Sequence, residues 1–153
     1  MRILAITNQK GGSGKTTTAV NLAAALGEKG RRVLLVDLDP QASATAWLGV
    51  KDAGRGIYDV FTNNKTIDSI TLNTSNTGVD VAPASAWLVG VEKALAGEVG
   101  TETLLKRAIG KLKNYDYVIL DCPPSLGLLT INALTAAREL LIPVEAHVLA
   151  LAG

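Results

Sequence analysis

The stretch Asn8-Gln9-Lys10-Gly11-Gly12-Ser13-Gly14-Lys15-Thr16-Thr17 decides the fold of this chain. It joins a short apolar segment, residues 3–6, to residues 16–26, whose apolar positions have helical spacing. Three glycines within four residues remove the Cβ atoms that would keep a backbone from closing round an anion. The N–H groups of such a turn, and the positive end of the following helix, attract negative charge. The stretch therefore predicts a cradle for phosphate groups.

Two residues at the end of this stretch suit a nucleotide site. Lys15 can reach the outer phosphates of a nucleotide, and the Thr16 hydroxyl can hold Mg²⁺. The general phosphate-loop pattern G-x-x-x-x-G-K-[ST] has a glycine at its head, where this chain has Gln9 followed by a second lysine, Lys10. A glycine-rich turn with a solvated lysine is the plain alternative. The position between a strand and a helix disfavours that alternative.

Length and composition point to one domain that spans residues 1–153. A hydrophobic content of 48% with only 4% aromatic residues suits an α/β protein rich in alanine and valine. The net charge of +1 gives no electrostatic indication of a nucleic-acid or membrane partner. No apolar run reaches the roughly 18 residues of a membrane-spanning helix. The single cysteine, Cys122, excludes an internal disulfide and suits a reducing cytoplasm.

Apolar segments of strand length alternate with segments of helical pattern along the chain. This alternation predicts an α/β fold with a doubly wound, mostly parallel sheet. Gly27 can end the first helix, and Thr101 is a candidate N-cap. The segments expected as strands are 3–6, 32–37, 79–82, 117–121 and 140–144, and those expected as helices are 16–26, 42–48, 57–61, 84–96, 101–112 and 128–137.

Three aspartates follow the ends of predicted strands. Asp37 and Asp39 come at the end of the second strand, and Asp121 ends the strand at 117–121. Because ligands of open parallel sheets gather at the carboxyl ends of the strands, these carboxylates should converge on the phosphate cradle. Carboxylates beside a polyanion make sense when a cation lies between them. The sequence therefore predicts a metal ion at this edge of the sheet.

Three stretches together resemble the ParA/MinD family of ATPases, which carries a deviant Walker A motif. They are Lys10 to Thr16, Val36 to Gln41 and Leu120 to Gly127. The resemblance covers the N-terminal portion of that family. The residues of the three motifs are most similar to those of partition ATPases of the ParA and Soj type. It implies a phosphate-loop NTPase fold, with ATP and Mg²⁺ as the bound groups. It also implies weak ATP hydrolysis that a partner stimulates.

The resemblance also implies a role for each site residue. Lys10 would cross to the nucleotide of a second subunit in an ATP-bound sandwich dimer. Asp39 would position or deprotonate the attacking water, Asp37 would lie near the Mg²⁺ shell, and Asp121 would hold Mg²⁺ through water. The implied residues are Lys10, Lys15 and Asp39 for catalysis; Lys10, Gly11, Gly12, Ser13, Gly14, Lys15, Thr16 and Thr17 for ATP; and Thr16, Asp37 and Asp121 for the metal.

The chain departs from the family's pattern at a few positions. Residue 13 is serine where many members have valine, a harmless change beside glycines. Ala42 and Ser43 replace the usual Gly-Asn after Pro-Gln, which slightly alters the flexibility of this switch loop. The family continues well beyond the length of this chain, so we expect that a C-terminal part is missing.

Several functions are compatible with these motifs. The first is an ATP-switched partition protein for plasmid or chromosome segregation. Its implied partners are a second copy of itself, a ParB-like centromere-binding protein and non-specific DNA contacted through the missing part, in a cytoplasmic, nucleoid-associated setting. The alternatives are a MinD-like division-site ATPase and a truncated interaction remnant that does not hydrolyse ATP. An iron-protein reductase is disfavoured because a cluster shared by two subunits needs two cysteines per chain.

Overall fold

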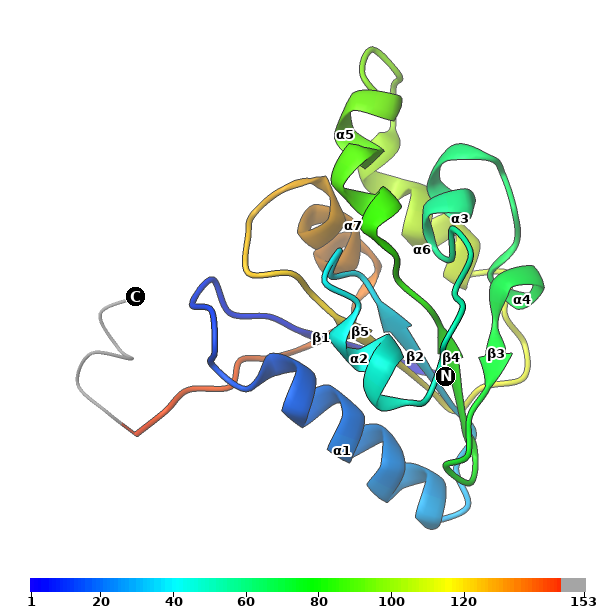
Figure 1. The fold of residues 1–153 in the computed structure, drawn as a ribbon, viewed down its shortest axis with the longest axis vertical. Helices are drawn as coiled ribbons and strands as arrows, with labels where there is room; N and C mark the ends of the chain where they lie inside the picture. The colour runs from blue at the N-terminus through cyan, green and yellow to red at the C-terminus, as the bar shows by residue number, and fades with distance from the viewer. Residues whose placement is uncertain (147–153) are drawn as a thin grey trace.

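A sheet of six strands forms the centre of the computed structural model, which describes residues 1–146 (Figure 1). The strand order is β3-β4-β2-β5-β1-β6, and each neighbouring pair is parallel except β3 and β4. The expected doubly wound, mostly parallel α/β sheet is therefore confirmed. The strands are β1 (Arg2–Ile6), β2 (Val33–Asp37), β3 (Leu72–Asn73), β4 (Val79–Ala82), β5 (Tyr117–Asp121) and β6 (Glu139–Leu141).

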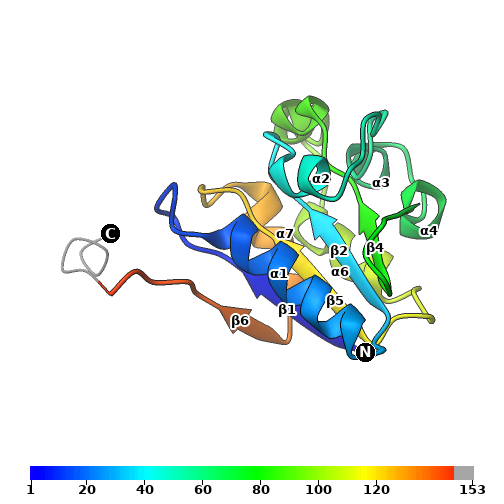
Figure 2. The same ribbon diagram turned by 60° about the horizontal axis from the view of Figure 1, so that its bottom comes forward.

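Helices cover both faces of this sheet. The longest helix, α1, lies on one face, and α6 and α7 lie on the other (Figure 2). The α-helices are α1 (Lys15–Glu28), α2 (Ser43–Trp47), α3 (Tyr58–Thr62), α4 (Ile67–Ile70), α5 (Val91–Ala94), α6 (Leu104–Ile109) and α7 (Leu128–Ala136), and the 3₁₀ helices are η1 (Ala86–Gly90) and η2 (Thr101–Thr103).

The core consists of two clusters, one on each face of the sheet. Successive residues of a strand point to opposite faces, so β2 contributes to both. Leu34 and Val36 pack with residues of α6 and α7, whereas Val33 and Leu35 pack with Ala19 and other residues of α1. All of these β2 residues are fully buried. The unbroken apolar run predicted for this strand is thus explained by helices on both sides.

The later helices differ from the sequence prediction. The helix expected over residues 84–96 is divided into η1 and α5, and the one over residues 101–112 is divided into η2 and α6. Thr101 does not cap a helix, because Gly100 precedes η2 and Thr101 is already helical. The start of α6 is capped from α7 instead, since Leu105 N–H donates to Oδ1 of the buried Asn132 over 3.0 Å. The prediction of Thr101 as N-cap was wrong because this cap is tertiary.

The two edges of the sheet also differ from expectation. Strand β6 ends at Leu141 rather than at residue 144, and Pro143 beyond it has no N–H for a strand ladder. Asn8 Nδ2 donates instead to the Pro143 carbonyl over 2.9 Å. Strand β3 is not among the strands that the sequence predicted, and it pairs antiparallel with β4. Residues 147–153, which precede the C-terminal part that we expect to be missing, lie outside the described residues.

Two glycines at the end of α1 have different tasks. Gly30, with a φ of +76°, terminates the helix, because its N–H donates to the Gly27 carbonyl and Arg31 N–H donates to the Leu26 carbonyl. Gly27 lies inside the helix, so its predicted role as the terminator was wrong. A Cβ at Gly27 would stand 2.1 Å from the carbonyl oxygen of Thr77. Gly27 therefore permits the close approach of α1 to the loop before β4.

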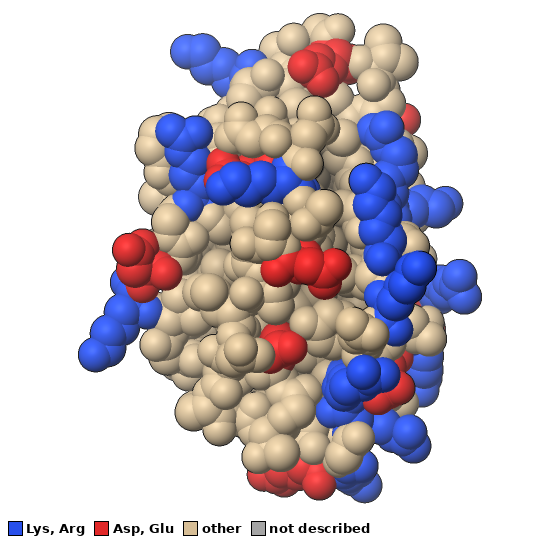
Figure 3. Space-filling view, turned by 90° about the vertical axis from the view of Figure 1, so that its right-hand side faces the viewer, with Lys and Arg blue, Asp and Glu red and all other residues tan. Residues whose placement is uncertain are grey.

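The surface charge is unevenly spread despite the net charge of +1. Lys and Arg side chains form a row along one side of the face shown in Figure 3. The net charge alone did not predict this row. Among the residues that the structure describes, no helix has the length and apolar character to cross a membrane.

Gly27→Ala should lower the free energy of unfolding by about 1–3 kcal/mol, because the added methyl group must displace backbone rather than a flexible side chain. Urea unfolding followed by circular dichroism measures this change. Gly90→Ala is the matched control, since a Cβ there meets no atom within 4 Å and the φ of Gly90 is −90°. Equal effects of the two substitutions would contradict the role of Gly27.

Candidate nucleotide site

A cavity of about 270 Å³ lies in the loop between β1 and α1. Its lining is Gly11, Gly12, Ser13, Gly14, Lys15, Thr16, Thr17, Asp39 and Pro124. These residues come from all three stretches that the sequence analysis singled out. The fold therefore brings the glycine-rich loop, the end of β2 and the loop after β5 to one place, at the carboxyl edge of the parallel strands.

The glycine-rich loop has a backbone that depends on glycine at two positions. Gly12 has a φ of +71° and Gly14 a φ of +83°, and both values lie in the left-handed region. Gly14 is the N-cap of α1, so no side chain satisfies the first N–H groups of that helix. The first turn also contains no acidic residue. The start of α1 is thus left open to an anion.

Two polar side chains in the loop have few hydrogen bonds: Lys15 has a single partner, and Ser13 has none. Lys15 is only 7% exposed, and its Nζ donates to the Lys10 carbonyl over 3.1 Å. The hydroxyl of Ser13 is buried without a hydrogen-bond partner. An ammonium group held beside the cavity by a single carbonyl, with open N–H groups around it, is suited to contact phosphate oxygens.

Asp121 is a buried carboxylate that contacts the first turn of α1. Its Oδ2 accepts a hydrogen bond of 2.8 Å from the Thr16 hydroxyl, and its Oδ1 is buried with no partner. Burial raises the pKa of Asp121 to about 7; the Thr16 hydrogen bond partly opposes this rise, and the charges of Asp37 and Asp39 add to it. An ionised carboxylate in this position would be stabilised by a cation.

Asp37 has contacts that the sequence did not predict. Its Oδ2 accepts from both the N–H and the hydroxyl of Thr45, at 2.9 and 2.7 Å. Its Oδ1 accepts from Asp39 N–H at 3.1 Å. The Thr45 hydroxyl also accepts from Ala84 N–H at 2.9 Å. Burial raises the pKa of Asp37, although the hydrogen bonds from Thr45 and Asp39 oppose the rise. Through Thr45, Asp37 connects β2 to α2 and to the chain after β4.

Asp39 and the residues after it form a turn at the rim of the cavity. Asp39 Oδ1 accepts from Gln41 N–H at 2.9 Å, and the Asp39 carbonyl accepts from Ala42 N–H at 2.8 Å. Ala42 has a φ of +54°, a conformation that costs a residue with a Cβ about 1–2 kcal/mol. The glycine usual in the resembled family would avoid this cost. The departure at Ala42 therefore makes this turn more strained.

Lys10 lies outside the lining of the cavity, at the head of the loop. Its backbone N–H donates to Asn8 Oδ1 over 2.9 Å, and its carbonyl holds Lys15. Its ammonium group is partly exposed and lies 3.8 Å from Glu145 Oε2. The side chain is therefore not part of the lining of its own cavity and is partly accessible to another molecule.

The three aspartates do not form a complete cage for a metal. Within residues 1–146, no group of three or more His, Cys, Asp or Glu side chains could hold a metal ion. The donors at the site are instead one hydroxyl, Thr16, and one carboxylate with a free oxygen, Asp121. This set suits Mg²⁺, which commonly keeps several waters and takes further ligands from phosphates.

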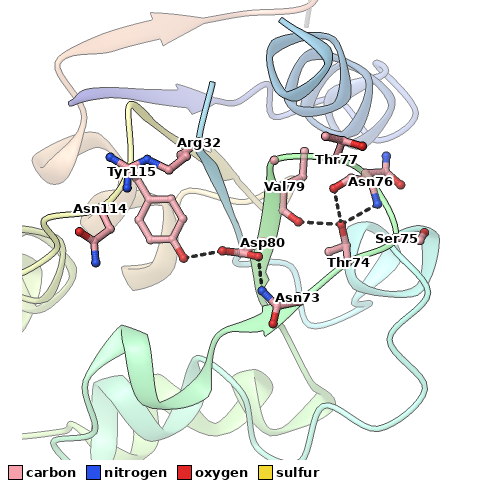
Figure 4. Close-up of a pocket in the computed structure, with 11 residues that line it drawn as sticks. Arg32, Asn73, Thr74, Ser75, Asn76, Thr77, Val79, Asp80, Asn114 and Tyr115 are labelled. Carbon is pink, nitrogen blue, oxygen red and sulfur yellow. Dashed lines mark hydrogen bonds between the residues drawn. The ribbon is translucent and has the colours of Figure 1, made fainter. Parts of the chain in front are cut away.

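A larger cavity, of about 570 Å³, lies away from these motifs, beside the loop before β4 (Figure 4). Several of its polar side chains have partners within the protein. Asp80 accepts from Tyr115 at 2.9 Å and from Asn73 at 2.7 Å, and the Thr74 hydroxyl donates to the Val79 carbonyl at 2.7 Å. These bonds fasten the edge strand β3 and the loop that follows it.

Comparisons with known proteins agree with this geometry. A family model described as an AAA domain matches residues 1–153. The chain is 51% identical to the sporulation initiation inhibitor protein Soj of Bacillus subtilis (strain 168), over 99% of this chain and 61% of that protein. It is 48% identical to the chromosome partitioning protein ParA of Myxococcus xanthus (strain DK1622), over 99% of this chain and 55% of that protein. This chain belongs to the ParA/MinD-type family of AAA domains.

A solved structure supports the fold of this ParA/MinD-type domain. The cobyrinic acid a,c-diamide synthase of Mycobacterium smegmatis, with a bound ATP analogue and magnesium, has a TM-score of 0.91 and 44% identity. The match covers 97% of this chain and 63% of that one. The chain thus spans about three fifths of the length of such relatives. The solved structure is named as a diamide synthase and the two relatives above as a sporulation initiation inhibitor and a chromosome partitioning protein. Proteins with this fold therefore carry different names, so the fold alone does not determine the biological role.

The free energy of unfolding of the ligand-free chain should fall as pH rises from about 4 to 7. The folded state keeps the Asp121 proton up to about pH 7, whereas the unfolded chain releases it near 3.8. Between these values the folded state binds more protons, so a rising pH costs roughly 2–4 kcal/mol of stability. Asp121→Asn should make this slope shallower and raise the stability at pH 8.

Urea unfolding at a series of pH values measures the slope, and Asp68→Asn, at an exposed position, is the control. Identical slopes for the unmodified chain and Asp121→Asn would show that burial of the Asp121 carboxyl has no energetic consequence.

Proposed function

We propose that this chain binds ATP with Mg²⁺ in the cradle around Gly11 to Thr17 and hydrolyses the ATP, as part of a partition ATPase for plasmids or chromosomes. The single observation that carries this proposal is the partly buried hydrogen bond between Thr16 and Asp121, with the other, buried carboxylate oxygen left unpaired beside an open helix N-terminus. These groups are satisfied together by a cation and a phosphate chain.

Each residue of the site would have its own role in phosphoryl transfer. Open N–H groups at the start of α1 and the ammonium of Lys15 bind and orient the phosphates. Thr16 and Asp121 would hold Mg²⁺, in the case of Asp121 through water, and the bound ion neutralises charge on the phosphates. Asp39, at the rim of the cavity, positions the attacking water or takes its proton. Asp37 lies near this shell and holds the turn that carries Asp39.

Lys10 completes the site of a second copy of the chain. Its side chain lies outside the lining of its own cavity and is partly exposed, which suits a cation supplied in trans to an ATP-bound sandwich dimer. Gly11 and Gly12 have no atom within 4 Å of an added Cβ, so two such loops could approach closely. ATP would therefore switch the protein between monomer and dimer.

The biological role rests on the relatives. The Myxococcus xanthus relative is named a chromosome partitioning protein, and this chain is 48% identical to it. By analogy, the partners would be a ParB-like centromere-binding protein and non-specific DNA, contacted through a part of the protein beyond residue 153. The protein would act in the cytoplasm, on the nucleoid. A MinD-like role in positioning the division site and a remnant that does not hydrolyse ATP are the alternatives, and an ATPase assay with and without DNA separates the latter.

Lys15→Ala should lower the affinity for Mg-ATP by at least about tenfold, because the cradle loses its buried charge toward the outer phosphates. Isothermal titration calorimetry measures the affinity, and Lys29→Ala, at an exposed position at the far end of α1, is the control. Unchanged affinity of the Lys15→Ala chain would contradict the assignment of the phosphate cradle.

Mixing two inactive variants tests the trans role of Lys10. Lys10→Ala and Asp39→Ala should each keep Mg-ATP binding and lose most hydrolysis, since trans cations of this kind contribute roughly 10³–10⁵ in rate. In a mixed dimer, the Lys10→Ala subunit keeps its own Asp39 and receives the lysine of the Asp39→Ala subunit. One site of two is then complete, so hydrolysis should return in part.

Single-turnover hydrolysis measures this recovery, with heterodimers verified by analytical ultracentrifugation. The doubly substituted chain, mixed with unmodified chain at the same ratio, is the control for dilution. Heterodimers without any recovered activity would mean that Lys10 acts within its own subunit or not at all.

A further inference from the structure

Helix α7 begins without a capping side chain of its own. Its N-cap, Gly127, has no side chain, and its first turn contains no acidic residue. Glu92 in α5 supplies the cap, because its Oε1 accepts a hydrogen bond of 2.8 Å from Leu128 N–H. The two residues are 36 positions apart in the sequence. A carboxylate at this position also interacts favourably with the helix dipole.

The glycine at position 127 is explained by this contact. Its φ of −79° and ψ of −173° are ordinary extended values that suit any residue. A Cβ there, however, would stand 2.5 Å from Oε1 of Glu92. Gly127 therefore makes room for the carboxylate rather than for an unusual backbone.

The segment from Asp121 to Leu128 connects the nucleotide site to this cap. At its start, Asp121 accepts from Thr16, and at its middle Pro124 lines the phosphate cavity. The Ser125 carbonyl accepts a hydrogen bond of 2.6 Å from the Thr130 hydroxyl in α7. The loop is thus fastened at its start by the site itself and at its end by α7. The position of α7 consequently affects the position of Pro124.

A cavity of about 230 Å³ separates this loop from α5 and from the turn after β2. The residues that line it include Pro40 from that turn, Leu88 and Glu92 from η1 and α5, and Pro123 and Gly127 from the loop. The loop after β5 is therefore not packed tightly against α5. Beside this space, the hydrogen bond that Leu128 N–H donates to Glu92 is a directional contact that defines where the loop ends.

We infer that Glu92 is a positioning residue for the ATP hydrolysis proposed above: it fixes the start of α7 and thereby the loop over residues 122–127 at the nucleotide site. The inference rests on the proposed function for its effect on rate, whereas the positioning itself is a property of the fold. Glu92 acts through Leu128 and is not among the residues that line the phosphate cavity. Its loss should therefore affect hydrolysis more than the binding of ATP.

The test compares Glu92→Ala, Glu92→Gln and Glu98→Ala in the 153-residue chain. Glu98 is an exposed glutamate shortly after α5 and serves as the matched control. For Glu92→Ala we expect amide hydrogen exchange about fivefold faster at Leu128, and single-turnover hydrolysis about tenfold slower, with Mg-ATP affinity within about twofold. Glu92→Gln keeps an acceptor oxygen and should restore most of both, whereas Glu98→Ala should change neither.

A double-substitution cycle checks that Glu92 and Gly127 act together. Gly127→Ala fits the local backbone but displaces the flexible carboxylate, so it should reproduce the effects of Glu92→Ala. In a chain that already carries Glu92→Ala, the added Gly127→Ala should change exchange and hydrolysis by less than about twofold. Additive effects of the two substitutions would overturn the inference.

Amide hydrogen exchange and ATP hydrolysis together distinguish a failure of this inference from a failure of the proposed function. A general loss of stability would also speed exchange at the core residue Leu35, and would thereby overturn a specific role of Glu92. Absence of hydrolysis in the unmodified chain contradicts the proposed function alone, and exchange over residues 122–128 then decides about Glu92. Exchange at Leu128 that is unchanged in Glu92→Ala overturns the inference whatever the ATPase result.

Discussion

The site depends on the placement of β5 between β1 and β2. The parallel register aligns Asp121 with Ile6 on one side and with Asp37 on the other. The strand ends that carry the glycine-rich loop and the two buried carboxylates are therefore adjacent. The hydrogen bond from Thr16 to Asp121 then joins the start of α1 to the end of β5. Without this pairing, the three motifs would lie at unrelated points of the surface.

The ligand-free site holds buried carboxylates and uncapped N–H groups close together. Bound Mg²⁺ and ATP would supply the opposite charges. Burial raises the pKa of both Asp37 and Asp121; the charge of Asp39 adds to both rises, and the charge of Asp37 adds to that of Asp121. The start of α1, which is joined to Asp121 through Thr16, adds N–H groups that no side chain caps. Since isolated buried charges and unpaired donors are costly, such an arrangement is stable when a cation and an anion bind together.

Hydrogen bonds between distant side chains and backbone groups hold the surrounding loops. Asp37 and Thr45 fix α2 and the chain at Ala84, Asn132 caps α6, and Glu92 caps α7. Each bond joins elements that are far apart in sequence and satisfies a backbone N–H that would otherwise be unpaired. Because several of these elements are short, helix propensity alone would not maintain them. The loops of the site thus take their positions from tertiary contacts.

The sequence alone determined the class of fold and the position of the phosphate cradle. Unbroken apolar strands, their alternation with helices and the glycines before Lys15 are local signals, and each has one dominant physical reading. The tertiary structure decided the features that depend on contacts between segments distant in the sequence. The short strand β3 exists because β4 offers it an edge, and Gly27 is required because α1 meets the Thr77 carbonyl. Likewise, the partners of Asp37 and Glu92 are set by packing between elements 8 and 36 residues apart, for which the sequence carries no periodic pattern.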